Sequence, residues 1–353
     1  MVQSGAYISD KPYPEKAIKL LDQTCAYVQG RKEKTVNGHL VNVVLENITH
    51  IPTELSASFK QKLLTVEQEL HKRVISQDDA VNEIAAALRK SFVLAGTHKK
   101  PIASFLFLGP TGVGKTETAK SITQVLFGDE QNMLRFDMSG YQTIEGIATL
   151  IGSPQTGEPG LLSQAVRQQK YGTLLLDELE KAHKDLLNIF LTVLDEGYFY
   201  DGFGNKVDCT HLIIIATSNA GADFIYQALN SQDASGVART LSKKLIDYLV
   251  AQHAYSPEFL NRFDGVIVYK PLQSDDIYKI ALGLLNNLKS DVFKTHGLTI
   301  EFSHTFVDNL IKQGYDVRFG ARNMQRAIQN EVESKIAKML LTNPNIKNRT
   351  IIF

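Results

Sequence analysis

Hydrophobic positions along the chain follow two different periods, and the change between them divides the sequence. Between residues 102 and 269, short apolar runs recur that are continuous rather than alternating, as is typical of strands buried on both faces of a parallel sheet. Helical stretches such as Glu117–Leu126 and Asp185–Leu194 separate these runs. We therefore predict a three-layer α/β domain built on a parallel sheet. Its expected strands are Phe105–Leu108, Leu134–Asp137, Leu174–Leu176, Leu212–Ala216 and Val266–Tyr269.

The regions on both sides of this domain show the helical period. Residues 58–92 predict two helices that are interrupted near Val74-Ile75-Ser76. After Pro271 the pattern is again mostly helical, and two short runs, Leu298–Phe302 and Thr350–Phe353, are able to pair as strands. We therefore expect a second, small and mostly helical domain. Its predicted helices are Asp275–Asn287, Thr305–Lys312 and Ala321–Leu341.

The start of the chain predicts a short helix followed by a hairpin. Tyr13-Pro14-Glu15 is typical of a helix start. In residues 35–41, Asn37-Gly38 lies between alternating apolar and polar positions, which is the strongest short-range signal for a hairpin. A polar linker with Pro52 follows. The apolar face of the helix is expected to comprise Ala17, Ile18, Leu20, Leu21 and Val28.

Composition disfavours several classes of protein, although a balanced net charge still leaves room for a local basic patch. Lys+Arg 38 balances Asp+Glu 38, so net charge gives no support for nucleic acid as the main partner. No apolar run approaches the roughly 18 residues that a membrane span needs, and the first residues lack the apolar stretch of a signal peptide. Cys25 and Cys209 lie far apart without metal-type spacing, which favours two reduced thiols in a cytoplasmic protein.

The sequence GPTGVGKT at residues 109–116 fits the phosphate-binding pattern G-x-x-x-x-G-K-[ST]. It lies between a predicted strand and a predicted helix, the context that this pattern requires and that argues against an unrelated glycine-rich turn. Glycines let backbone N–H groups approach phosphate oxygens, and the helix N-terminus adds its positive dipole. The lysine supplies a charge and the threonine offers a hydroxyl to Mg²⁺. The residues predicted to bind nucleotide are Gly109, Pro110, Thr111, Gly112, Val113, Gly114, Lys115 and Thr116.

Two acidic residues end the apolar run Leu174–Leu176. Carboxyl ends of parallel strands are where ligands bind in α/β sheets, so Asp177 and Glu178 are predicted to lie beside the phosphate loop. Asp177, with Thr116, is predicted to hold Mg²⁺ or its water, and Glu178 to polarise the attacking water. Solvated acids at a strand end are the alternative, and the phosphate loop upstream weakens it.

Thr217-Ser218-Asn219 ends the strand expected at Leu212–Ala216. Two interpretations are equally supported by this motif alone. Asn219 could hold the water that attacks the phosphate, or the segment could simply form a turn, since Ser-Asn is common turn chemistry.

Taken together, GPTGVGKTE, LLLDELEKAH, IIIATSN, SPEFLNRFD and RFGAR occur in an order that resembles the second ATPase ring of Clp-type AAA+ unfoldases. LHKRVISQDDAV before the phosphate loop and FGDE after its helix also match. The resemblance runs from about Leu55 to the end, and the opening YISD and PEKAIKLLD are similar to the last helical part of that family's first ring. It implies a remnant of a preceding small domain with hairpin and linker at 1–54, an AAA+ nucleotide-binding domain at 55–271, and a small lid domain at 272–353.

The resemblance also implies roles for single residues. Asn219 matches the family's first sensor, Arg262 the arginine finger that reaches a neighbouring subunit's γ-phosphate, and Arg322 the second sensor. A lone arginine is more often a surface salt bridge, so these roles depend on the motifs around them. Val74 and Ile75 match the adenine pocket. The family has glycine at the next position, where this chain has Ser76, so we expect a slightly different turn.

Residues 150–162 depart most from the family, whose loop here is rich in glycine and tyrosine and grips polypeptide in the ring's pore. In this chain the loop is shorter and has no aromatic residue. The segment 197–204 (GYFYDGFG) is unusually aromatic and could serve instead, although we favour a half-buried hairpin. No Ile-Gly-Phe-like tripeptide precedes Ser256, so a peptidase partner is unsupported.

From this resemblance we expect an ATP-dependent and Mg²⁺-dependent chaperone of the Clp type that remodels or unfolds polypeptide substrates. A hexameric ring is implied by the family alone. The alternative is a scaffold that is switched by ATP and oligomerises without threading, which the short loop favours and the full set of hydrolytic residues disfavours. An AAA+ machine acting on DNA is disfavoured because charge is balanced and no DNA-binding module is recognisable.

Overall fold

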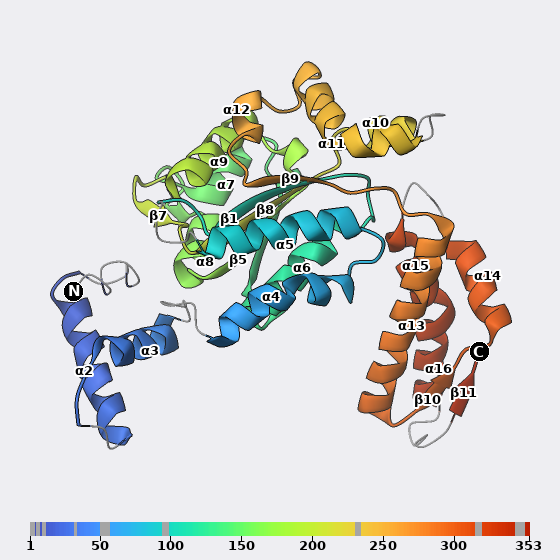
Figure 1. Cartoon of the computed structure of the whole chain (residues 1–353), viewed down its shortest axis with the longest axis horizontal. Helices are drawn as coiled ribbons and strands as arrows, with labels where there is room; N and C mark the ends of the chain where they lie inside the picture. Colours follow the sequence, from blue (N-terminus) through green and yellow to red (C-terminus); the bar gives the residue numbers. More distant parts are fainter. Residues whose placement is uncertain are drawn as a thin grey trace.

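The computed structural model describes residues 4, 8, 12–31, 34–49, 57–93, 99–229, 234–314, 320–342 and 350–353. Within these ranges the chain is centred on a five-stranded parallel sheet in the order β2-β5-β8-β1-β9 (Figure 1). All five predicted strands are confirmed. Their bounds are β1 Ala103–Leu108, β2 Met133–Asp137, β5 Gly172–Asp177, β8 Leu212–Ser218 and β9 Gly265–Val268.

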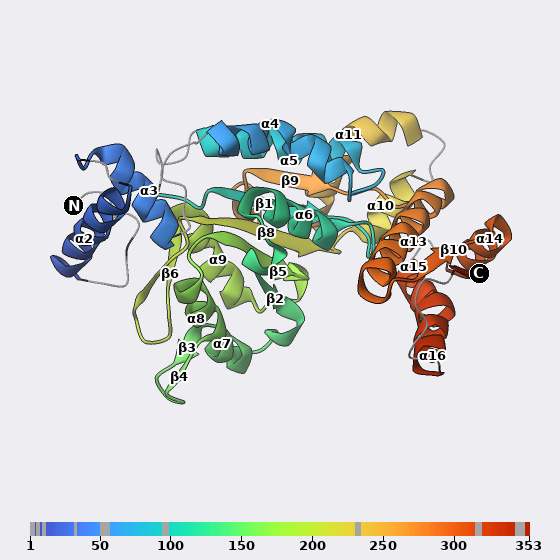
Figure 2. The ribbon, with the colours of Figure 1, turned by 90° about the horizontal axis from the view of Figure 1, so that it is seen from below.

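Helices cover both faces of this sheet, which confirms the three-layer prediction. Side chains of β1 alternate between two hydrophobic clusters, with Phe105 and Phe107 in one and Leu106 and Leu108 in the other. Figure 2 shows α4 and α5 above the sheet and α7, α8 and α9 below it. The helices are α4 Ala57–His71, α5 Asp78–Val93, α6 Lys115–Phe127, α7 Ile144–Ile151, α8 Leu161–Gln168, α9 Lys184–Glu196, α10 Ala222–Leu229, α11 Ala234–Ala251 and α12 Pro257–Leu260.

The central strands β1, β5 and β8 are buried at every position. This explains why their sequences are continuous apolar runs, because neither face of the strand reaches water. Strand β2 lies at the edge and is only partly buried, and its sequence accordingly includes Arg135 and Asp137. The parallel register aligns Asp137 with Asp177 and Leu108 with Ser218, so the ends of four strands meet at one edge.

The predicted hairpin at residues 35–41 is wrong. Gly38 begins helix α3 (Gly38–Thr49), and the Asn37 side chain accepts a hydrogen bond of 2.9 Å from the N–H of Leu40. Asparagine favours helix N-caps as well as turns, so Asn-Gly fits both structures locally. Burial decides between them, because Val44 and Leu45 of α3 form a small core with Leu20 of α2.

Helix α2 (Glu15–Gly30) confirms the predicted opening helix, but its buried stripe is narrower than expected. Ala17, Leu20 and Val28 are buried, whereas Ile18 and Leu21 are more than half exposed. These two residues lie on the side of the helix that does not pack on α3. In Figures 1 and 2 this helix pair lies at the opposite end of the molecule from the C-terminal helices.

The C-terminal region forms the expected small helical unit. Strands β10 (Thr299–Glu301) and β11 (Thr350–Ile352) pair in parallel, which confirms their predicted association. The helix expected over 321–341 is interrupted by a π-helical turn, Gln329–Glu333. The helices of this unit are α13 Ser274–His296, α14 His304–Gly314, α15 Ala321–Ile328 and α16 Ser334–Thr342.

Two small hairpins extend the layer below the sheet. The first pairs β3 (Gly152–Ser153) with β4 (Glu158–Pro159), and the second pairs β6 (Tyr198–Tyr200) with β7 (Lys206–Asp208). The predicted half-buried hairpin is therefore confirmed, with Phe199 at 2% exposure and Tyr200 at 56%.

The two hairpins pack closely against each other at glycine residues. The N–H of Gly202 donates to the carbonyl of Ile151, and a Cβ added at Gly202 would lie only 1.9 Å from the carbonyl oxygen of Gly152. Such close approach is open only to glycine. The turn of the second hairpin is further held by Asp201, which is buried and paired at 2.6 Å with Arg167 of α8.

Candidate nucleotide-binding site

The loop between β1 and α6 has the backbone shape of a phosphate cradle. Gly109, Gly112 and Gly114 adopt φ angles of 154°, 77° and 108°, a region that other residues rarely enter. Gly114 is the N-cap of α6 and has no side chain with which to satisfy the free N–H groups of the first helical turn. Those groups are therefore available to an anion, and a phosphate fits the position.

Lys115 lies at the start of α6 and is buried. Its Nζ donates to the carbonyl of Gly109 at 2.5 Å, to that of Pro110 at 2.8 Å and to the Oδ1 of Asn219 at 2.9 Å. Burial lowers the pKa of Lys115 to about 8, while the charge of Glu180 opposes this shift. Among the described residues, the acceptors that contact this ammonium are all neutral, so its charge is available to a bound phosphate.

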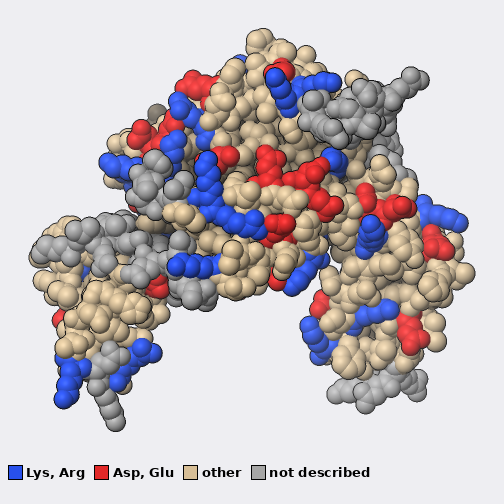
Figure 3. Space-filling view, viewed as in Figure 1, with Lys and Arg blue, Asp and Glu red and all other residues tan. Residues whose placement is uncertain are grey.

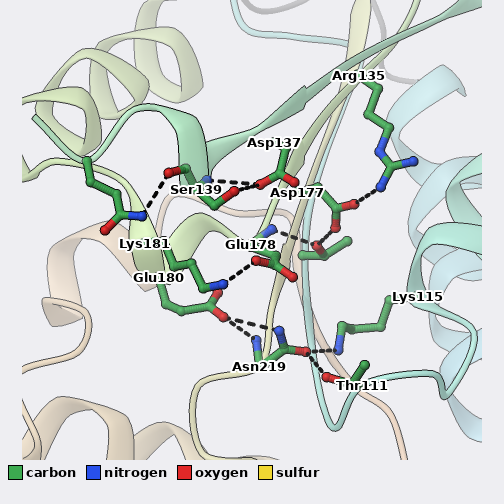
Figure 4. Close-up of polar contacts among 12 residues, drawn as sticks. Thr111, Lys115, Arg135, Asp137, Ser139, Asp177, Glu178, Glu180, Lys181 and Asn219 are labelled. Carbon is green, nitrogen blue, oxygen red and sulfur yellow. Dashed lines mark hydrogen bonds and ion pairs between the residues drawn. The ribbon is translucent and has the colours of Figure 1, made fainter. Parts of the chain in front are cut away.

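Asp177 ends β5 beside this lysine. One carboxylate oxygen accepts a hydrogen bond from the hydroxyl of Thr217, and the other pairs with Arg135 at 2.6 Å (Figure 4). The side chain is 6% exposed, whereas Arg135 is about half exposed. Thr116 is half-buried in the first turn of α6. A carboxylate and a hydroxyl next to a phosphate position fit the ligand preference of Mg²⁺.

Glu178 follows in a strained turn with φ 56° and ψ 48°. The left-handed region costs about 1–2 kcal/mol for a residue with a Cβ, and such outliers cluster at active sites. The N–H of Glu178 donates to Thr217 at 3.2 Å, which stabilises the turn, and its carboxylate pairs with Lys181 at 2.6 Å. The turn thus presents the carboxylate beside the strand ends.

Asn219 joins the acidic and basic parts of the site. Its Oδ1 accepts from Lys115, and also from Thr111 at 3.4 Å. Its backbone N–H and its Nδ2 donate to the same oxygen of Glu180, at 3.2 and 3.3 Å. In Figure 4 the amide lies between Glu180 and the phosphate loop. The structure therefore brings Asn219 into the site, although its carbonyl also accepts a turn hydrogen bond from Ala222.

The expected adenine pocket lies on the other side of the loop, where α4 ends. Val74 is 3% exposed, and its Cγ1 is 4.0 Å from the place of a Cβ on Gly114. Ile75 is half-buried beside it. Ser76 adopts φ 59°, so the turn has the left-handed backbone that glycine enters most easily.

The lid helix α15 contacts the phosphate loop directly. The N–H of Ala321 donates to the carbonyl of Gly112 at 3.0 Å, and a Cβ on Gly320 would lie 2.6 Å from that oxygen. Arg322 is exposed in the first turn of α15, and its charge is among the influences that lower the pKa of Lys115. The structure thus brings Arg322 near the site.

Arg262 is not brought to this cluster. It follows α12 and is 38% exposed, with its Nε 2.8 Å from Asp195 and a second nitrogen 3.5 Å from Glu258. Among the described residues, its ion pairs are with these surface acids of its own chain.

Sequence reasoning missed several residues of the site. Arg135 could have been found, because it is a charged residue on a strand next to β5 and shares a face with Asp137. Glu180 and Lys181 lie in the motif after Glu178, but their partners depend on how the turn bends. The contact of Ser76 with the lid joins residues 200 positions apart, and no local pattern indicates it.

Comparison with known proteins agrees with this geometry. Residues 2–78 match the model of an AAA lid domain, residues 100–266 an AAA domain of the Cdc48 subfamily, and residues 272–353 the C-terminal D2-small domain of ClpB protein. The chain is 39% identical over 318 residues to a probable chaperone protein ClpB 1 of Chlorobaculum tepidum, covering 88% of this chain and 72% of that protein. The chain belongs to the ClpB family of AAA+ ATPases.

Other relatives of this ClpB-type chain are longer. It is 38% identical to the chaperone protein ClpB of Vibrio vulnificus, with 96% of this chain and 39% of that protein covered. A closed-state structure of Hsp104 with ATPγS and FITC-casein superimposes with a TM-score of 0.82 at 32% identity, covering 99% of this chain and 60% of that one. The chain thus spans 39% of the Vibrio protein and 60% of the Hsp104 chain, less than two thirds of each. In the part of the chain that the structure describes, no helix combines the length and hydropathy needed to cross a membrane.

Proposed function

We propose that this chain binds MgATP, hydrolyses it, and uses the energy to remodel or unfold polypeptides. The observation that carries this proposal is that the ends of neighbouring strands place two hydrogen-bonded groups beside the phosphate loop. Asn219, which follows β8, accepts from Lys115, while the hydroxyl of Thr217 in β8 bonds Asp177, the last residue of β5, and accepts from the backbone N–H of Glu178. Phosphoryl transfer depends on positioned charges of this kind rather than on covalent chemistry.

Each residue has a distinct task in this proposal. The loop amides and Lys115 hold the β- and γ-phosphates, and Thr116 and Asp177 would hold Mg²⁺, which neutralises charge on the phosphates when bound. Glu178 accepts a proton from the attacking water, and Asn219 orients that water or the γ-phosphate. Arg322 adds positive charge from the lid. Val74 and Ile75 line the adenine side.

Arg262 is proposed to act on the neighbouring subunit of a hexameric ring, because its ion pairs are with Asp195 and Glu258 rather than with its own chain's site. Asn261 next to it lines a surface groove of about 330 Å³ together with Ile246, Val250 and Leu260. An apolar groove beside the arginine supports a subunit contact at this edge. In this arrangement the domains divide at 1–54, 55–271 and 272–353, with the lid and the large domain both contributing to each site.

The named relatives support a chaperone over a scaffold, since the ClpB proteins are chaperones by name and the Hsp104 structure contains casein. Lys, Arg, Asp and Glu are interspersed over the face in Figure 3, with no continuous basic surface for nucleic acid. Cys25 and Cys209 are both free thiols, which fits a cytoplasmic location.

The decisive experiment measures ATP turnover by this chain with and without an unfolded protein such as casein, over a range of chain concentrations. We expect Mg²⁺-dependent turnover that rises with concentration and is stimulated by casein. Turnover that casein does not change would support the scaffold. Absence of turnover at all concentrations, with ATP bound, would contradict the hydrolytic role.

A further inference from the structure

We propose that Ser76 is a positioning residue that ties the adenine side of the site to the lid and slows the release of nucleotide. This inference rests on the proposed nucleotide site. It assigns to that site a contact between the turn after α4 and the first turn of α13 (Ser274–His296), two segments separated by 200 residues.

The backbone of Ser76 is held in a conformation that serine rarely adopts. Its φ of 59° lies in the left-handed region, which glycine enters without steric cost. The Clp-type pattern has glycine here, so serine introduces strain at a turn that glycine would satisfy. The hydroxyl that serine adds is engaged, since it donates to the Oδ1 of Asp276 at 2.5 Å. A hydrogen bond to a carboxylate is stronger than one between neutral groups.

Asp276 lies in the first turn of the lid helix α13 and links the Ser76 contact to the start of that helix. Its other carboxylate oxygen accepts the N–H of Gln273 at 2.9 Å, as part of the capping box that begins α13. The next residue, Ile277, is 1% exposed and belongs to the same hydrophobic cluster as Val74. A single carboxylate therefore joins the start of the lid's longest helix to the turn beside the adenine pocket.

Neighbouring contacts do not replace this one. Gln77 makes two hydrogen bonds to the backbone of Lys270, and Lys270 pairs with Asp79 at 2.5 Å. Lys270 precedes α13 and directly follows the strand β9 and Tyr269 of the sheet domain, so these bonds hold the sheet domain to itself. Among the hydrogen bonds and ion pairs of the described residues, Ser76 is the residue of this turn whose side chain bonds the lid helix.

The lid touches the site at a second point, where Ala321 donates to the phosphate loop at Gly112. Nucleotide held between Val74, Ile75 and the phosphate loop can leave more easily when the lid tilts away. Removing the hydroxyl of Ser76 loosens the start of α13, which then keeps the apolar packing of Ile277 and the contact of Ala321 with Gly112. Release of nucleotide should then be faster, while groups that contact phosphate stay unchanged.

Two substitutions separate the hydrogen bond from backbone strain. Ser76→Gly removes the hydroxyl and relieves the strain, whereas Ser76→Ala removes the hydroxyl and keeps the strain. The probe is fluorescently labelled ADP bound to the whole chain and displaced by excess ADP in a stopped-flow experiment. We expect release to become about 3- to 10-fold faster in both variants, as partial loss of a charge-assisted hydrogen bond implies. The midpoint temperature of thermal unfolding should fall further in the alanine variant than in the glycine variant.

Asp79→Asn is the matched control, because it breaks an exposed ion pair in the same segment that does not reach the lid. It should leave the rate of ADP release unchanged. If Ser76→Gly binds ADP and releases it at the wild-type rate, the positioning role is wrong and the proposed site is unaffected. If the wild-type chain binds no labelled ADP, the proposed function itself fails.

Discussion

The nucleotide edge of the sheet and the pair of hairpins below it are built on opposite principles. At the edge, polar side chains are buried and each contacts a named partner, as Lys115 contacts Asn219 and Asp177 contacts Thr217. In the hairpins, backbone packs against backbone at Gly152 and Gly202, while Tyr200 and Phe203 are exposed to solvent.

The difference gives a physical reason to expect that the first region keeps the family's pattern and that the second departs from it. A buried polar cluster loses several interactions when one member changes, since any partner left behind is unsatisfied. An exposed hairpin tip can change its side chains while the glycine contact keeps the hairpin in place. The chemistry of this chain is thus expected to be that of its relatives, and its hold on substrate is expected to be its own.

The largest effect that would sharpen this comparison is expected at Arg262, which we propose acts on the neighbouring subunit's site from outside the cluster. Arg262→Ala should bind ATP normally and hydrolyse it about 10³-fold more slowly, as for arginine fingers elsewhere. Mixing it with Lys115→Ala subunits should partly restore turnover, because each variant supplies what the other lacks. Asp195→Asn controls for the lost ion pair. Activity per subunit that stays constant over a wide dilution series would argue against a shared site.

Glu178 tests the chemistry of the cluster itself. Glu178→Gln keeps the size of the side chain and removes the base, so hydrolysis should fall by about 10²- to 10⁴-fold while ATP stays bound. Calorimetry and a phosphate-release assay on the same sample measure both quantities. Turnover near the wild-type rate would mean that another group activates the water.

Lys115 tests the binding half of the cluster. Lys115→Ala should weaken MgATP binding by roughly 100-fold, because a charge-assisted contact to phosphate is lost. Isothermal calorimetry gives the affinity, and Lys335→Ala, which removes an exposed lysine of the lid paired with Glu331, provides the control. If Lys115→Ala binds MgATP with unchanged affinity, the assignment of residues 109–116 as a phosphate-binding loop is wrong.

The smallest effect is expected at the hairpins. The β3–β4 loop has no aromatic side chain, so we expect this chain to unfold a stable protein slowly. Any grip should come from Tyr198 and Tyr200, whereas Phe199 is buried and cannot contact substrate. Changing both tyrosines to alanine should slow unfolding of a tagged fluorescent protein about 2- to 10-fold and leave ATP turnover intact. Strong unfolding that survives this change would show that the grip lies elsewhere.

The sheet domain could be predicted from the sequence because its signals are local. Continuous apolar runs identified the strands, and the glycines of residues 109–114 identified the loop between β1 and α6. The helix α3 could not be predicted in this way. Asn37-Gly38 suits a turn and a helix start equally, and only packing of Leu45 against α2 decides between them.

The same limit applies to the candidate site. Lys115, Asp177 and Asn219 each belong to a recognisable motif at a strand end, and parallel topology brings such ends together. Arg135 could have been found as a charged residue on a strand, but Asp276 could not be assigned, because its partner comes from the docking of the lid. A contact that depends on how two folded units are placed relative to each other does not appear in the hydrophobic pattern of either sequence segment.

Helix α9 gives the molecule a mechanical connection between its two unlike regions. It is a single 13-residue helix, about 20 Å long. Its first turn follows Glu178 through the short helix Leu179–Lys181, and its last residue adjoins Gly197 and the β6–β7 hairpin. Buried contacts of Leu186, Phe190 and Leu194 keep it stiff against the sheet. The helix therefore joins the β6–β7 hairpin to the turn that carries Glu178 through one continuous, buried element.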